Sequence, residues 1–178
     1  REAALALEMA SEPARAFVRD LMRRPSPLGG AFHHGERLHL RLAGGEAGVD
    51  AAAKEIGGEA EDLGFWDAVR DFRHPALTRE NRLWRLSLPQ TAPIPTLGEI
   101  VAWDWAGAQV WIRSDAPAPS IWRVVADVGG HATLFCGADA DEEVFQPLAP
   151  VMAALHRRVK AALDPAGIFN PGRLYGDL

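Results

Sequence analysis

Four pairs of adjacent glycines divide this chain into short segments, and they restrict the fold more than any other feature of the sequence. The pairs begin at Gly29, Gly44, Gly57 and Gly129. Glycine often follows the last residue of a helix or interrupts a strand, because it adopts backbone conformations that other residues avoid. None of the pairs belongs to a GxGxxG or GxxxxGK[ST] phosphate loop. We interpret them as helix ends and turns, which predicts a fold of many short elements.

Several segments between these breaks carry apolar residues at helical spacing. Ser11, Glu12 and Pro13 form a typical helix start, and the helix that follows is expected to end before Pro25. Residues 25–30, rich in proline and glycine, are expected to form a loop. Four further helices are predicted, over residues 46–56, 62–73, 121–128 and 148–163.

Strand signals fill the remaining segments. Alternation of apolar and polar residues predicts a strand at 37–42, and strands are also expected at 82–88, which Pro89 ends, and at 131–136. Two aromatic runs at 100–105 and 109–112 predict a hairpin. From residue 37 the order suits an α+β fold, an antiparallel sheet with helices on one face, close to a ferredoxin-like lobe. We expect three parts: an N-terminal helix and linker, an α+β domain, and a C-terminal helix and tail. Their bounds are 1–30, 31–146 and 147–178.

Composition excludes several classes of partner. The formal net charge is -5, and the basic residues are scattered singly, so no stripe for nucleic acid is expected. No window approaches the roughly 18 apolar residues of a membrane helix, and the first ten residues lack the layout of a signal peptide. Cys136 is the single cysteine, which rules out a disulfide framework and suits the cytoplasm.

Histidines and acidic residues offer few candidate sites. His33, His34 and Glu36 are three potential metal ligands, but adjacent histidines point apart in an extended chain. We interpret them as a solvated loop and expect no metal site, while a small hydrolase that uses this loop stays open as an alternative. The acidic run at 59–62 is interpreted as charged surface.

The chain contains six tryptophans. They either fill the core or line a surface for a planar ligand or another subunit. Trp103 and Trp105 are two residues apart in the predicted hairpin, which places them on one face of a strand.

The most specific motif lies after the last predicted helix. Residues 163–173 read Leu-Asp-Pro-Ala-Gly-Ile-Phe-Asn-Pro-Gly-Arg. Asp164 and the proline after it stop the helix, Gly167 permits a turn, and Asn170 begins a second tight turn. Such an elbow can present the Asn170 amide and the Arg173 guanidinium to a polar ligand.

This tail resembles the DPxxxFNPG segment that closes FAD-linked oxidases of the vanillyl-alcohol-oxidase superfamily. The rest of the chain resembles, more narrowly, the FAD-binding subunit of bacterial glycolate oxidase. The weaker motifs that carry this second resemblance occur in order at residues 38–53, 65–70, 83–87, 104–111 and 129–134.

The resemblance implies that the chain is the cap and C-terminal portion of an FAD-dependent oxidoreductase subunit. Such a subunit binds FAD between an N-terminal domain and a cap, and works with a second flavin subunit and an iron-sulfur subunit on a small 2-hydroxy acid. The N-terminal flavin domain is missing from this sequence, so we expect the chain alone to retain no FAD and to be inactive. No catalytic residue is assigned.

For cofactor binding, the resemblance points to Asn170 as a polar contact to the flavin and to Arg173 as a charge partner. The alternative for Asn170 is that it only caps its turn. The alternative for the whole chain is a free-standing ferredoxin-like module for binding or regulation, which would form a dimer through the tryptophan-rich hairpin.

Overall fold

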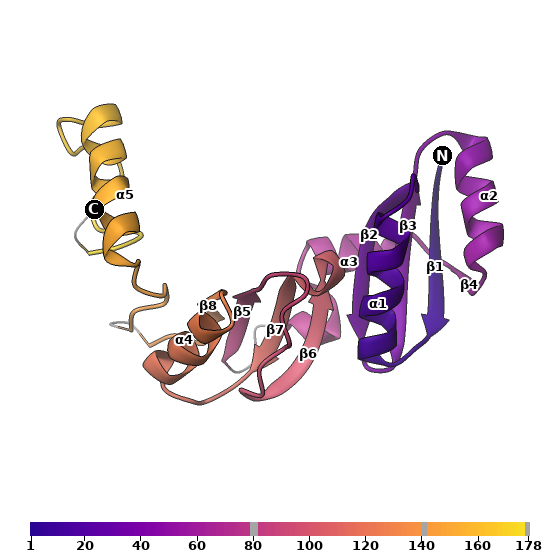
Figure 1. Ribbon diagram of the computed structural model, residues 1–178, viewed down its shortest axis with the longest axis horizontal. Coiled ribbons are helices and arrows are strands. Elements are labelled where there is room, and N and C mark those ends of the chain that lie inside the picture. Colours follow the sequence, from indigo (N-terminus) through magenta and orange to yellow (C-terminus); the bar gives the residue numbers. More distant parts are fainter. Residues whose placement is uncertain (79–81, 140–141, 177–178) are drawn as a thin grey trace.

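The computed structural model describes residues 1–78, 82–139 and 142–176, and these form one antiparallel sheet with five α-helices (Figure 1). The elements are β1 (Glu2–Glu8), α1 (Ser11–Met22), β2 (Leu28–His34), β3 (Arg37–Ala43), α2 (Glu46–Ile56), β4 (Glu59–Glu61), α3 (Gly64–Arg70), the 3-10 turn η1 (Pro75–Leu77), β5 (Leu83–Ser87), β6 (Glu99–Asp104), the 3-10 turn η2 (Trp105–Gly107), β7 (Gln109–Arg113), α4 (Ala118–Asp127), β8 (His131–Cys136) and α5 (Pro150–Leu163).

The sheet consists of two halves with the same topology. Its strand order within the described residues is β4-β1-β3-β2-β6-β7-β5-β8. From the β4 edge inward, the first half has the order β4-β1-β3-β2, which are its fourth, first, third and second strands. From the β8 edge inward, the second half has the order β8-β5-β7-β6, which are likewise its fourth, first, third and second strands. Residues 88–98 connect β5 to β6, as α1 connects β1 to β2 in the first half. The first half is a ferredoxin-like unit.

The two halves join where β2 meets β6, through the pairs Phe32 with Asp104 and His33 with Trp103. The Trp103 indole donates a hydrogen bond to Ser11 Oγ at 2.9 Å, which ties this seam to the start of α1. Both Phe32 and Trp103 are fully buried. The seam is therefore part of the core and joins the halves into one body.

The main core lies between the sheet and the helices α1, α2 and α4. On β3 the alternating leucines Leu38, Leu40 and Leu42 are fully buried, as the period of two predicts for a strand with one covered face. Each of the three helices adds a buried valine to this core: Val18, Val49 and Val125. The predicted α+β class with an antiparallel sheet is confirmed.

A smaller core lies on the opposite face, under α3 and η1. Two of its aromatic pairs pack edge to face, with Phe32 and Phe65 centroids 5.8 Å apart and Phe72 and Trp111 centroids 5.4 Å apart. Gly30 leaves room here, because a Cβ at that position would lie only 3.1 Å from the Trp66 ring. Three helices thus cover one face, and α3 covers part of the other.

Three strands were not predicted from sequence, and all lie in the first half. Residues 2–8 form β1, residues 28–34 form β2, and residues 59–61 form β4. The expectation of a loop at 25–30 is wrong at its end, because Gly29 and Gly30 lie within β2. These segments contain alanine, glycine and glutamate, which have low strand propensity, and pairing with neighbouring strands overrides that preference. The expected N-terminal part, 1–30, therefore contributes β1 and the start of β2 to the sheet. The division into three parts stays a prediction.

The predicted hairpin is confirmed as β6 and β7, which pair along their length. The expectation that Trp103 and Trp105 share a face is wrong. Trp103 is fully buried, whereas Trp105 lies in η2 with φ 49° and is 68% exposed. The strand ends at Asp104, so the period of two no longer applies to Trp105.

The chain leaves the sheet after β8. The Leu134 amide donates to the Val144 carbonyl at 2.9 Å, and the Ala132 amide donates to Gln146 Oε1 at 2.8 Å, so residues 144–146 cover part of the β8 edge. Figure 1 shows α5 standing apart from the sheet, and none of its residues is buried. No helix in the described ranges has both the length and the apolar character needed to cross a membrane.

Candidate functional site

The tail folds back against the end of α5 around one carboxylate. Asp164 is 7% exposed, and its two oxygens accept hydrogen bonds from the Ile168 and Phe169 amides at 2.9 Å each. Lys160 forms an ion pair with Asp164 at 2.8 Å and also donates to the Phe169 carbonyl. The Lys160 hydrogen bond and the two amides lower the pKa of Asp164 to about 2. The residues predicted to stop the helix therefore form a hydrogen-bonded turn, which we call the elbow (residues 164–173).

Asn170 lies at the turn of this elbow with a left-handed backbone. Its φ is 47°, and Gly167 and Gly172 have φ values of 64° and 67°. Asparagine tolerates this conformation better than other residues with a side chain. The Arg173 amide donates to the Asn170 carbonyl at 3.2 Å and closes the turn. Backbone geometry alone thus gives one reason for an asparagine here, and its side chain remains exposed.

A groove of about 490 Å³ runs between α5 and the elbow, and Asn170 lies on its wall. The other lining residues are mostly apolar: Leu155, His156, Val159, Lys160, Leu163, Asp164, Phe169 and Leu174. This surface is open to solvent, since Leu163 is 78% exposed and Phe169 is 66% exposed. A mostly apolar lining that also carries His156, Lys160, Asp164 and Asn170 fits a planar, largely apolar group with polar edges.

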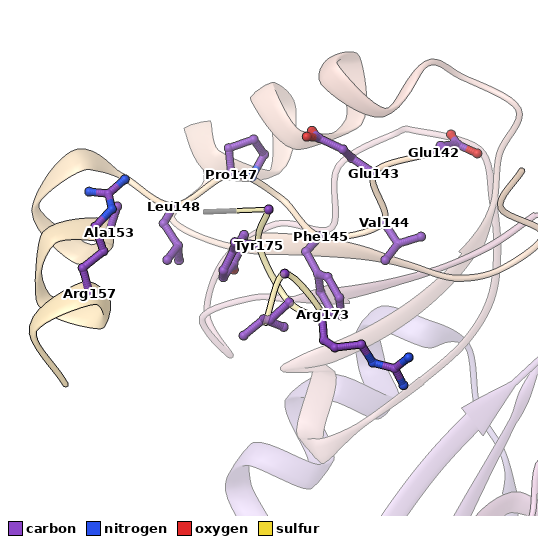
Figure 2. Close-up of a pocket in the computed structure, with 13 residues that line it drawn as sticks. Glu142, Glu143, Val144, Phe145, Pro147, Leu148, Ala153, Arg157, Arg173 and Tyr175 are labelled. Carbon is purple, nitrogen blue, oxygen red and sulfur yellow. The ribbon is translucent and has the colours of Figure 1, made fainter. Parts of the chain in front are cut away.

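Arg173 lies on a second hollow, of about 550 Å³, between the tail and residues 142–148 (Figure 2). Tyr175 holds this part of the tail, with its ring 6.2 Å from Phe145 and 6.4 Å from His156, centroid to centroid. In Figure 2 the Arg173 guanidinium points away from Tyr175. The two predicted cofactor residues therefore line different hollows, and Arg173 does not face the groove that carries Asn170.

The interpretation of His33 and His34 as a solvated loop is wrong, because both lie in β2. His33 is 3% exposed, bonds through Nε2 with the Met9 carbonyl at 2.9 Å, and stacks on Trp103 with centroids 5.1 Å apart. Burial lowers the pKa of His33. His34 lies on the opposite face and bonds with the Val101 carbonyl. Across the described ranges, no three His, Cys, Asp or Glu side chains are grouped to hold a metal ion.

The acidic run at 59–62 is only partly surface. Glu59 pairs with Arg37 at 2.5 Å on the exposed side of the sheet. Glu61 pairs with His39 at 2.9 Å, and both side chains are largely buried. Burial lowers the pKa of His39, and the bond to Glu61 opposes this shift. The strand β4, which the sequence did not reveal, brings Glu61 to this position.

Asp104 is a buried carboxylate to which the sequence analysis assigned no role beyond the motif at 104–111. It ends β6 at the seam, and burial raises the pKa of its carboxyl to about 6. Its Oδ2 accepts a hydrogen bond from Gln109 at 2.9 Å. In the sequence, Asp104 is a single carboxylate between two tryptophans in an apolar run. That pattern does not predict burial of the carboxylate unless the fold is known.

Comparisons with known proteins agree with the resemblance of the tail. Residues 136–174 match the family of FAD linked oxidases, C-terminal domain. The chain is 36% identical over 171 residues to the glycolate oxidase subunit GlcE of Escherichia coli (strain K12). The alignment covers 96% of this chain and 48% of that subunit, so the chain spans about half the length of the curated relative it matches. No solved structure matches the chain. The resemblance to the FAD-binding subunit of bacterial glycolate oxidase is confirmed.

Proposed function

We propose that this chain supplies the cap and the C-terminal, flavin-proximal segment of an FAD-dependent oxidase subunit that acts on a small 2-hydroxy acid such as glycolate. One observation carries the proposal. The segment that matches the oxidase family, 136–174, contains α5 and the elbow, and these hold an open apolar groove with Asn170 on its wall. The similarity over the rest of the chain to a glycolate oxidase subunit suggests the substrate class.

The apolar side of α5 needs a covering surface. Val151, Leu155, Val159 and Leu163 follow one another at helical spacing, and each is at least 46% exposed. Isolated helices of this length are marginal in water, and most helices gain their stability by packing an apolar face. An exposed row of this kind marks a binding surface. Its occupant in this proposal is the N-terminal FAD domain, since the relative is about twice as long as the part that this chain matches.

Bound FAD would supply the redox chemistry, and the chain would position it. The Asn170 amide can donate to and accept from a flavin edge, while Leu155, Val159 and Phe169 can exclude water beside it. Arg173, on its separate hollow, would serve as a charge partner to the cofactor or to a neighbouring domain. The lysine and carboxylate beneath the elbow would hold it rigid during this contact.

The proposal includes partners and a location. A second flavin subunit and an iron-sulfur subunit would complete the oxidase, and the single cysteine, Cys136, suits a cytoplasmic setting. Alone, the chain would bind FAD poorly and would show no oxidase activity. The rival interpretation, a free-standing module that forms a dimer through its tryptophan-rich hairpin, is not favoured, because two of the three hairpin tryptophans, Trp103 and Trp111, are buried and Trp105 alone of the three is exposed.

The absorbance spectrum of the longest polypeptide that contains this chain tests the proposal. We expect flavin bands in that polypeptide, and we expect this chain to bind added FAD more weakly than about 1 μM. A colourless longer polypeptide would contradict the assignment. Submicromolar FAD binding by this chain alone would contradict the role given to the N-terminal domain.

A further inference from the structure

The turn after β6 holds a tryptophan in solvent on a strained backbone. Trp105, Ala106 and Gly107 have φ values of 49°, 57° and 83°, a left-handed run that residues with a side chain rarely adopt. Trp105 is 68% exposed, whereas the other tryptophans of the chain are buried or half-buried. Such exposure leaves little packing to offset the strain, and strained backbone that persists is concentrated at binding and functional sites.

A buried arginine holds this turn in place. Arg15, on α1, is 2% exposed, and its Nη2 donates to the carbonyls of Gln90 and Ala92 at 3.1 and 2.9 Å. The Gln90 side chain donates in turn to the Trp105 carbonyl at 3.4 Å. Gly107 packs directly on Arg15, because a Cβ at that position would collide with Arg15 Nε. The backbone beneath the indole is therefore fixed against α1, and a fixed anchor loses less entropy on binding.

Trp105 stands between two hollows, of about 370 and 500 Å³. Residues 29–31, at the start of β2, line both of them. This part of β2 has no strand beside it on that side, because β6 pairs with β2 only at Phe32 and His33. The smaller hollow also contains Met22, which is 54% exposed. An exposed tryptophan flanked by hollows and by a second exposed apolar side chain is typical of an interface anchor.

The first residues of the chain lie beside the larger hollow. Glu2 lines it together with Trp105, and the Arg1 amino group donates to the Gly44 carbonyl at 2.8 Å. Residues 136–174 match a family of C-terminal domains, and the relative is about twice as long as the part that this chain matches. A polypeptide that completes the chain to that length therefore adds most of its residues before Arg1. Figure 1 shows the N-terminus and α5 on the same, upper side of the molecule, so one added domain can contact both.

We infer that Trp105 and Met22 anchor the domain that precedes Arg1 in the longer polypeptide, and that both side chains are buried in that contact. The identity of the occupant rests on the proposed function, in which an N-terminal FAD domain completes this chain, whereas the strain and exposure of Trp105 do not depend on it. The contact is separate from the one on α5, because no residue of α5 lines either hollow. Trp105 is an interface residue in this inference, and no catalytic role is assigned to it.

Oxidative footprinting, read residue by residue by mass spectrometry, tests the inference on this chain and on the longer polypeptide. Trp105 and Met22 should be oxidised readily in this chain, where both are exposed, and several-fold more slowly in the longer polypeptide. The protection should not depend on protein concentration, because the contact lies within one polypeptide. Equal oxidation in the two proteins overturns the inference. Protection that appears only at high concentration also overturns it, because a second copy would then be covering Trp105.

Trp105→Asn separates the contact from the fold. Asparagine adopts a left-handed backbone more readily than tryptophan, so this variant of the chain should unfold at the same urea concentration as wild type or at a higher one. In the longer polypeptide, the variant should make Met22 oxidise several-fold faster, close to its rate in this chain.

Ile100→Thr is the matched control, because Ile100 is 46% exposed near the opposite end of β6. It should leave Met22 protected in the longer polypeptide. Unchanged protection of Met22 in Trp105→Asn, or an equal loss of protection in both variants, overturns the inference.

The inference and the proposed function fail separately. If the longer polypeptide is yellow and protects Leu155 on α5 but leaves Trp105 reactive, the Trp105 contact is overturned and the oxidase assignment stands. If Trp105 and Met22 are protected in a longer polypeptide that carries no flavin, the contact is supported and the oxidase assignment is contradicted.

Discussion

Lys160 Nζ, in the last turn of α5, lies 2.8 Å from Oδ2 of Asp164, the residue that follows the helix, and the same carboxylate accepts hydrogen bonds from two amides of the elbow. This carboxylate joins the last helix to the segment that follows it. The elbow should therefore depend on the charge of Asp164 more than on any apolar contact, because Ile168 and Phe169 are largely exposed.

Asp164→Asn should loosen the elbow without unfolding the sheet. The variant keeps one acceptor but loses the ion pair with Lys160. Hydrogen exchange at the Ile168 and Phe169 amides should become faster, and exchange in β3 should not change. Asp127→Asn, at the exposed end of α4, is the matched control. Unchanged exchange at both elbow amides would show that the carboxylate does not hold the turn.

The same pair predicts how the elbow responds to acid. The pKa of Asp164 is about 2 in the folded protein, against an ordinary value of 3.8. The ionised carboxylate therefore stabilises the elbow fully above about pH 3.8, and this stabilisation is lost as the pH falls toward about 2. Exchange protection at Phe169 should thus persist at about pH 4.

Asp104→Asn should stabilise the protein at neutral pH. The pKa of Asp104 is about 6 in the fold and 3.8 ordinarily, so the folded state holds this proton more tightly than the unfolded chain. Stability from this group falls as the pH rises from about 4 to 6 and stays lower above that range. Asparagine avoids the buried charge, and we expect a gain of about 2 kcal/mol at neutral pH, with a smaller gain near pH 4.

Urea unfolding of both proteins at the two pH values measures this difference. A gain of equal size at both values would show that the effect does not come from ionisation of Asp104. A loss at neutral pH would mean that the fold stabilises the Asp104 carboxylate, which is the opposite of what a raised pKa requires.

His74→Asn should reduce the acid sensitivity of the small core. Burial lowers the pKa of His74 to about 4 from 6.5, and nearby His34 and His39 add to this effect. The folded state binds this proton less well, so wild-type stability falls as the pH drops from about 6.5 to 4. In the wild type, His74 Nδ1 accepts a hydrogen bond from the Ala76 amide. The side-chain oxygen of an asparagine can accept the same hydrogen bond.

As the pH drops from about 6.5 to 4, wild type should lose about 1 kcal/mol more of its free energy of unfolding than His74→Asn does. This is less than the full pKa shift would give, because His74 is partly solvated. Thermal unfolding at several pH values checks it. Parallel pH profiles for His74→Asn and wild type would contradict the assignment of this acid sensitivity to His74.

Much of the fold was predictable because β3 alternates clearly, β6 and β7 are short aromatic runs, and the helices show clear apolar faces. The strands β1, β2 and β4 escaped prediction because alanine, glycine and glutamate give weak local signals there. Their pairing depends on neighbours that are distant along the chain, such as Glu2 with Ala43. The matching topology of the two halves depends on these three strands, so it was not predicted from the sequence.

The candidate site was predictable only in part. The motif at 164–173 identified the elbow, because its residues set a helix stop and two turns by local geometry. That Asn170 and Arg173 line separate hollows depends on how the tail packs against α5 and Phe145, which no local pattern encodes. The burial of Asp104, which raises its pKa, depends on the seam, and the seam forms between segments that are distant along the chain.

The flavin content of the longer polypeptide, compared between two neighbouring substitutions on α5, tests the central claim most directly. Leu155→Asp places a charge in the exposed apolar groove, whereas Ala154→Asp places the same charge beside it, outside the groove lining. We predict that Ala154→Asp retains bound FAD at the level of the unmodified protein and that Leu155→Asp loses most of it. Full FAD retention by Leu155→Asp would contradict the claim that this face of α5 completes the flavin site.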